Sequence, residues 1–165
     1  MKQYSKTVMK KRGLIFTFIV LMFSVLVSCE NEDDENGENK DMSSSFNENE
    51  SHNAGQNCMA CHKSGGQGVG WFSAAGTVYN ASGAAVSPNA TVKLYTGPNG
   101  TGSLVKTIEV DGKGNFYTTS SIDFGTGLYV SVTGKAGSIS KMSSSITTGQ
   151  CNSCHGSSTS KISAE

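Results

Sequence analysis

Arginine and histidine are scarce in this sequence. No arginine follows Arg12, and the 165 residues contain only three histidines. Arginine is the usual residue for bidentate contacts with phosphate, and proteins that bind nucleic acids generally carry a concentrated basic patch. The lysines after residue 50 are instead spread along the chain. The composition therefore argues against a nucleic-acid partner.

A hydrophobic run long enough to span a membrane is also lacking. The run from Leu14 to Val27 holds 14 residues without a charge, whereas a transmembrane helix needs about 20. Lysines and Arg12 precede it, so the pattern predicts a signal peptide over residues 1–28, with an uncleaved membrane anchor as the alternative. The run ends in Leu26-Val27-Ser28-Cys29, which resembles a bacterial lipobox. The resemblance implies that Cys29 is lipidated and anchors the protein to a membrane.

Apolar residues are rare in the segment that follows. Residues 30–50 hold nine acidic side chains, one basic side chain (Lys40) and one aromatic ring (Phe46). Such a segment cannot bury enough apolar surface to fold, so we expect residues 29–50 to form a lipidated, disordered tether. An acidic run directly after a lipidated cysteine also resembles the surface-export signal of some outer-membrane lipoproteins. We therefore expect the protein to be lipid-anchored at the cell envelope, at the outer membrane. The acidic run leaves two possibilities open: it directs the protein to the cell surface, or it is a plain solvated linker.

Four of the five cysteines form two pairs of identical spacing, and a histidine follows each pair. The pairs are Cys58-Met59-Ala60-Cys61-His62 and Cys151-Asn152-Ser153-Cys154-His155, which match C-x-x-C-H, the attachment sequence of c-type haem. Two thiols three positions apart lie on one face of a helical turn. There they can add to two vinyl groups on one edge of a porphyrin, and the imidazole that follows can bind the iron. We therefore predict two covalent c-type haems, with His62 and His155 as the proximal iron ligands.

Zinc and disulfides are the alternatives to haem. Two C-x-x-C pairs could bind one zinc ion if residues 58–61 and 151–154 met in space, and an exported protein can form disulfides. Neither alternative explains why two of the three histidines stand directly after a C-x-x-C pair. A thioredoxin-like redox pair belongs to a βαβ pattern that the sequence lacks. We therefore favour haem.

Few side chains are left to serve as the second axial ligand of each iron. His52 is the only histidine outside the two motifs, and Met142 lies upstream of the second motif. Histidine and methionine both bind haem iron, so these two residues are the candidate distal ligands. The alternatives are a solvated histidine and a packed methionine. Trp71 and Phe72 are candidates to cover the first haem.

No convincing amphipathic helix follows residue 50, where Gly, Asn, Ser and Thr separate short alternating runs typical of strands. The alternation predicts a mainly β fold, with a small antiparallel β-sandwich over residues 74–142. We expect strands at 75–79, 91–95, 104–110, 115–118, 128–132 and 136–141. The side chains expected to face the core are Val92, Leu94, Leu104, Ile108, Val110, Phe116, Leu128, Val130, Val132 and Ile139.

Several of these runs follow the order of a known sandwich family. The matching segments are Gly76-Thr77-Val78, the Gly83 to Pro88 turn, Ala90 to Leu94, Asp111 to Phe116 and Gly127 to Val132. In this order they resemble the carboxypeptidase-regulatory-like, or prealbumin-like, β-sandwich family. The resemblance implies a scaffold or binding module that usually has seven strands, of which six are recognised here. The sandwich shows no Ser-His-Asp set and no carboxylate pair, so we expect no enzymatic activity and identify no small-molecule substrate.

The predicted order is a first haem segment at 51–73, the sandwich at 74–142, and a second haem segment at 143–165 with a tail disordered from Gly156. With an exported, lipidated N-terminus, this order resembles the small dihaem c-type cytochromes of bacterial extracellular electron transfer. The resemblance implies electron exchange with redox partner proteins or other cytochromes. The alternative is a β-sandwich binding or adhesion module whose cysteines bind zinc or form disulfides.

Overall fold

The computed structural model describes residues 39–165 of the chain. The predicted signal peptide, the lipobox residue Cys29 and the first part of the predicted tether lie outside the described residues. Within residues 39–165, no helix combines the length and the apolar character that crossing a bilayer requires.

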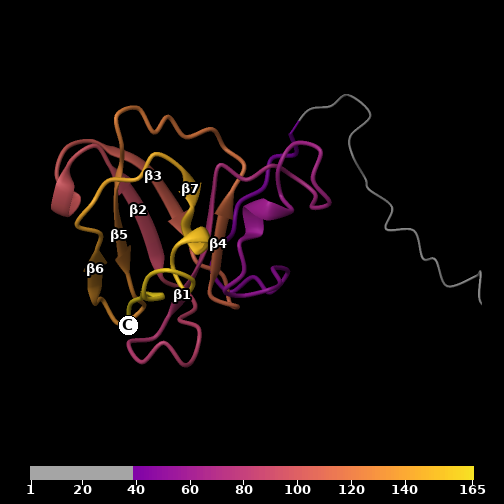
Figure 1. Ribbon diagram of the computed structural model, residues 1–165. Helices are drawn as coiled ribbons and strands as arrows, with labels where there is room; N and C mark the ends of the chain where they lie inside the picture. Colours follow the sequence, from indigo (N-terminus) through magenta and orange to yellow (C-terminus); the bar gives the residue numbers. More distant parts are fainter. Residues whose placement is uncertain (1–38) are drawn as a thin grey trace, which may run out of the picture. The chain divides into compact units, whose positions relative to one another are not determined.

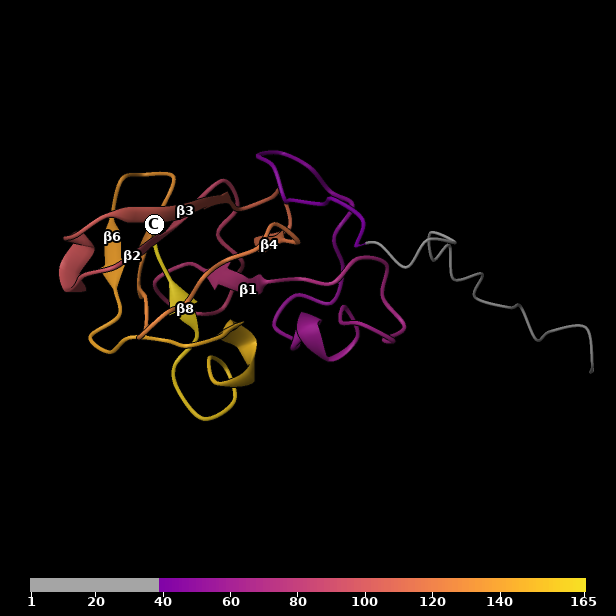
Figure 2. The same ribbon diagram turned by 90° about the horizontal axis from the view of Figure 1, so that it is seen from above.

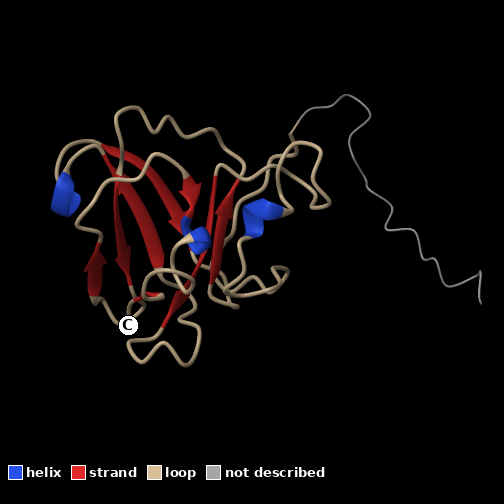
Figure 3. Ribbon diagram, viewed as in Figure 1, coloured by secondary structure: helices blue, strands red, loops and turns tan. Residues whose placement is uncertain are grey.

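Strands, drawn as arrows in Figures 1 and 3, dominate the described residues. They form two sheets of four strands each. The first sheet contains β1 (Ala74–Tyr79), β4 (Asn115–Thr118), β7 (Gly149–Gln150) and β8 (Ile162–Ser163). The second contains β2 (Thr91–Tyr95), β3 (Leu104–Glu109), β5 (Tyr129–Thr133) and β6 (Ile139–Lys141). Strand order is β4-β1-β7 in the first sheet, with β8 also paired to β1, and β3-β2-β5-β6 in the second. The prediction of a mainly β fold rich in antiparallel pairing is therefore confirmed.

The pairing differs between the two sheets. The second sheet is antiparallel throughout. In the first sheet β1 pairs antiparallel with β4 but parallel with β7 and β8. Two 3-10 turns, η2 (Cys58–Ala60) and η4 (Cys151–Ser153), lie beside β1, as Figure 2 shows. A third turn, η3 (Pro98–Gly100), connects β2 to β3. Strand β1 is therefore the element around which both cysteine motifs are placed.

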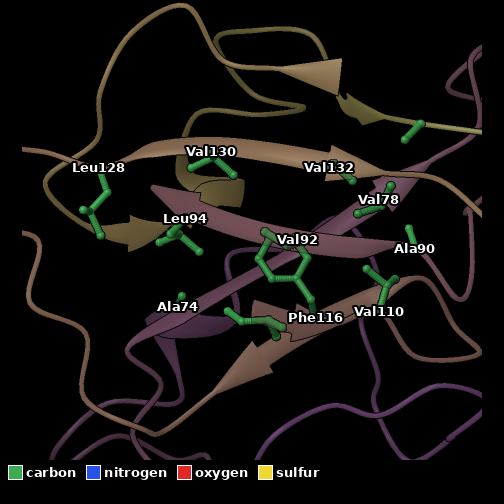
Figure 4. Packing of buried hydrophobic residues seen from close by; sticks show 12 residues of the cluster. Ala74, Val78, Ala90, Val92, Leu94, Val110, Phe116, Leu128, Val130 and Val132 are labelled. Atoms are coloured by element: carbon green, nitrogen blue, oxygen red, sulfur yellow. The ribbon is translucent and has the colours of Figure 1, made fainter. Parts of the chain in front are cut away.

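Apolar side chains of both sheets form one core, shown in Figure 4. Val78 of β1 and Phe116 of β4 pack with Val92 and Leu94 of β2. The period-two alternation predicts which side chains face the core, and this prediction is confirmed at eight positions. The buried side chains at these positions are Val92, Leu94, Ile108, Val110, Phe116, Leu128, Val130 and Val132.

Two positions expected to face the core are exposed. Leu104 is 52% exposed, because the β2–β3 register shifts there: Leu94 pairs with Lys106, but Tyr95 pairs with Leu104. A bulge of this kind adds one residue to a strand and reverses the side to which its neighbour points. Ile139 is 60% exposed, because β6 is a three-residue edge strand with no buried residue.

Residues 39–50 make specific hydrogen bonds with the rest of the described chain. Composition places residues 39–50 in the disordered tether, but in the structure the Ser44 N–H donates to the Tyr117 carbonyl at 3.0 Å and Ser44 is buried. The Gly112 N–H likewise donates to the Glu48 carbonyl at 2.7 Å. These contacts use main-chain groups of β4 and of the loop before it, so a segment with few apolar side chains can still be held in place.

The C-terminal tail differs in the same way from the expectation of disorder. Ile162 of β8 pairs with Val78 of β1, and the Ala164 N–H donates to the Tyr79 carbonyl at 2.9 Å. Ala164 is buried in the core cluster. A two-residue strand is too short to show a period-two pattern, so the sequence gives no strand signal there.

Two leucines on paired strands test the register. Leu94→Ala removes a side chain that is 2% exposed and is expected to lower the free energy of unfolding by about 3 kcal/mol. Leu104→Ala is the matched control, since the same side chain is half exposed there; its effect is expected to stay within about 0.5 kcal/mol. Urea denaturation of both variants measures the difference. Equal destabilisation would contradict the bulge.

Candidate haem sites

The two cysteine motifs adopt the same backbone turn. In each, the N–H groups of the second cysteine and of the histidine donate to the carbonyl of the first cysteine. The distances are 3.1 and 2.9 Å in the first motif and 3.3 and 3.0 Å in the second. Side chains three positions apart eclipse one another in a 3-10 turn, so the two thiols of a motif lie on one side. Two segments with different spacer residues therefore fold alike.

The imidazoles of the two motifs are also held alike. Nδ1 of His62 lies 2.9 Å from the carbonyl oxygen of Val69, and Nδ1 of His155 lies 2.6 Å from that of Ser160. A carbonyl oxygen only accepts, so each Nδ1 is assigned the proton and donates it. Nε2 of a neutral ring is then left with its lone pair, which is the state of a metal-binding histidine whose orientation is fixed by a hydrogen bond.

The first motif opens onto a cavity of about 210 Å³. Both thiols and His62 line it, and so does His52. The ring centroids of His52 and His62 are 5.7 Å apart. The structure therefore brings the candidate distal histidine to the candidate proximal one.

Two aromatic side chains form a stack with the His62 ring. Its ring stacks on Phe72 at a centroid distance of 4.2 Å, and Phe72 stacks on Tyr117 at 4.8 Å. Phe72 is buried and lines the cavity, whereas Trp71 is not among the lining residues. Of the two aromatic residues expected near the first haem, only Phe72 is in position to contact it.

The second motif borders a smaller cavity of about 160 Å³. Cys151, His155 and Met142 line it together, whereas the exposed Cys154 is not among the lining residues. The Met142 side chain also packs against the core cluster. The structure thus places the candidate distal methionine in the same cavity as the second proximal histidine.

Charge differs between the two cavities. Among the described residues that line the first, Glu50 is the only Asp, Glu, Lys or Arg side chain. Lys141 and Lys161 line the second, which has no carboxylate among its described lining residues. Both cavities are smaller than about 300 Å³, the lower end of enclosed small-molecule sites. A porphyrin attached here would therefore be only partly covered by protein.

The four thiols are free, and burial affects them unequally. Desolvation raises the pKa of the Cys58 thiol, and the neighbouring Cys61 thiol raises it further. Desolvation also raises the pKa of the Cys151 thiol, to about 12. Cys61 and Cys154 are exposed. Within residues 39–165, no three His, Cys, Asp or Glu side chains gather as a metal site. The tetrahedral zinc site of the alternative interpretation is therefore not preformed among the described residues, whereas each motif keeps the residue types and the spacing that c-type haem attachment requires.

Several residues of the site carry no signal in the sequence. Met42 and Glu50 line the first cavity but belong to the acidic segment, and Asn115 and Tyr117 reach the same cavity from β4. Asn152 is a spacer residue of the second motif, yet it is buried and hydrogen-bonded to Thr77. No family model, curated protein or solved structure matches this chain. The functional argument therefore rests on the geometry of the two motifs.

Thiol reactivity of the haem-free protein tests this geometry. Cys61 and Cys154 are expected to be alkylated first and Cys151 last. A thiol with a pKa of about 12 instead of 9.0 holds about a thousandfold less thiolate at pH 8. A time course of iodoacetamide labelling, read by peptide mass mapping, measures the order. If Cys151 reacts as fast as Cys154, the buried placement of Cys151 is wrong.

Proposed function

We propose that this protein is an exported c-type cytochrome that carries two covalent haems and transfers electrons at the cell envelope. The observation that carries the proposal is the repeated turn. In both motifs the thiols lie on one side and the imidazole donates Nδ1–H to a main-chain carbonyl. A disulfide or a zinc site has no need of a histidine held in this state directly after each cysteine pair.

The residues have separate roles in this proposal. Thioether bonds from each cysteine pair hold one porphyrin, and the histidine that follows supplies the proximal ligand. The residues in these roles are Cys58, Cys61, His62, Cys151, Cys154 and His155. When bound, each haem supplies one-electron iron chemistry. His52 and Met142 are the proposed distal ligands, because each lies in the cavity of one proximal histidine.

The sandwich acts as the scaffold, and we propose that it belongs to the prealbumin-like class. Through β1 the sandwich positions the second site, because Gly76 of this strand lies directly against Cys151. A Cβ at Gly76 would lie 3.0 Å from the Cβ of Cys151 and 2.6 Å from the Phe116 ring. Only glycine lets the motif approach the strand so closely. Cys29 is the proposed lipid anchor to the outer membrane.

Shallow cavities suit exchange with other proteins. A haem that is only partly covered leaves an edge near solvent, where a redox partner protein or another cytochrome can approach it. Solvent exposure and the distal ligand both influence a haem's reduction potential. We therefore propose protein partners and no small-molecule substrate.

Haem attachment is tested directly by intact mass. The protein made in a host that matures c-type cytochromes is expected to gain the mass of two haems and to keep haem stain through denaturing electrophoresis. Changing Cys58 and Cys61 to Ala is expected to remove one haem and leave the other, because the two sites have separate cysteines. Ser153→Ala is the control, since it changes a spacer only. A colourless protein with one zinc ion, or with four free or disulfide-bonded thiols, would overturn the proposal.

The distal role of His52 is tested by spectroscopy. His52→Ala is expected to convert one low-spin haem to high spin, in absorbance and in paramagnetic resonance, while both haems stay covalently attached. Asn53→Ala is a matched control, because Asn53 is the exposed neighbour that also lines the first cavity. Unchanged spectra in the histidine variant would show that His52 binds neither iron.

A further inference from the structure

A buried polar side chain joins the two motifs. Asn152, the first spacer residue of the second motif, is 7% exposed. Its side-chain oxygen accepts a hydrogen bond from the Thr77 N–H at 3.1 Å. Its amide donates to the Thr77 hydroxyl at 3.1 Å and to the Gln56 carbonyl at 2.9 Å. Gln56 lies two residues before Cys58, so a side chain of the second motif binds the backbone that leads into the first.

The Thr77 hydroxyl is the centre of this connection. Thr77 is fully buried on β1. Its oxygen accepts from the Asn152 amide and from the Gly55 N–H at 2.8 Å, and its hydrogen is donated to the Asn115 side-chain oxygen at 2.6 Å. A hydroxyl has one donor and two acceptor positions, and all three are used.

Asn115 extends the connection to the segment that carries the candidate distal histidine. Its amide donates to the Ser51 hydroxyl at 2.9 Å and to the His52 carbonyl at 3.4 Å. The backbone N–H of Asn115 donates to the Asp111 carboxylate at 2.9 Å, so the backbone and the side chain of Asn115 are both held by hydrogen bonds. One chain of hydrogen bonds thus reaches from the second motif to His52.

A buried network of this kind favours a single geometry. Hydrogen bonds in the low dielectric of the interior are strong, and the loss of one member leaves its partners unpaired at a cost. We propose that Asn152 is a positioning residue that holds the two CxxCH motifs, and hence the two haems, in one fixed mutual arrangement. This inference rests on the proposed function, since it concerns how two haems are held for electron exchange between them.

The optical coupling of the haems tests the inference in the full-length, haem-loaded protein. Two chromophores in a fixed arrangement give a two-signed circular dichroism signal in the Soret band, and their reduction midpoints influence each other. Asn152→Ala removes all three hydrogen bonds that the Asn152 side chain makes to Thr77 and Gln56. Asn152→Asp keeps the acceptor for the Thr77 N–H but replaces the donor to Gln56 with a repelling oxygen. It therefore removes the amide's donations to the Gln56 carbonyl and to the Thr77 hydroxyl but keeps the acceptor for the Thr77 N–H on β1, should the alanine variant fail to fold.

Both variants are expected to keep two covalent haems but to lose most of the two-signed Soret signal and to shift the separation of the two midpoints. Ser153→Ala, the exposed spacer neighbour of Asn152, is expected to leave both unchanged. If the two Asn152 variants carry two haems with the wild-type signal and midpoints, the role of Asn152 is refuted while the cytochrome proposal stands. A wild-type protein without covalent haem overturns the cytochrome proposal itself.

Amide hydrogen exchange on the haem-free chain tests the role of Asn152 independently of the cytochrome proposal. In Asn152→Ala the Thr77 N–H loses its acceptor, and its exchange is expected to become about fivefold faster, as the loss of a hydrogen bond worth about 1 kcal/mol implies. In Asn152→Asp the Thr77 N–H is expected to stay protected. Unchanged exchange in the alanine variant would show that Asn152 does not bind β1, and would refute its positioning role whatever the haem content.

Discussion

Strand β1 must satisfy hydrogen-bonding groups along both of its edges, and it does so with segments from distant parts of the chain. β4 pairs along one edge, whereas the short strands β7 and β8 pair in parallel with its two ends. Because β7 runs directly into the second cysteine motif, that motif is carried to the strand by main-chain pairing. The segment that leads into the first motif reaches the same strand at the Thr77 hydroxyl, which accepts from the Gly55 N–H. Both sites therefore depend on one buried strand, although their sequences are more than 80 residues apart.

The sequence predicts the parts of this arrangement that have a period or a spacing. Val92 and Leu94 alternate along β2 and are buried, and the two C-x-x-C-H spacings form equivalent turns. Leu104 is the exception, because a bulge depends on the match between two strands and leaves no mark in either one alone. Asn152 could not be predicted either, since a single spacer asparagine has no pattern until its partners on β1 are known.

The segment before the first motif shows a second limit of reasoning from composition. Few apolar side chains imply little burial, and that argument is sound for side chains. It does not count the main-chain groups along β4, to which residues such as Ser44 bind. Met42 and Glu50 reach the first cavity because this segment is held there. Part of the first site is therefore built from residues that composition alone assigns to a linker.

The two cavities differ in the charge of the side chains that line them, and this difference would bias electron transfer between the two sites. An electron added to an iron is stabilised by nearby positive charge and destabilised by nearby negative charge. Lys141 and Lys161 line the cavity of the second motif, and Glu50 lines that of the first. If the two sites hold haems as we propose, these side chains would make the second haem the better electron acceptor. Electrons would then pass downhill from the N-terminal site toward the C-terminal one.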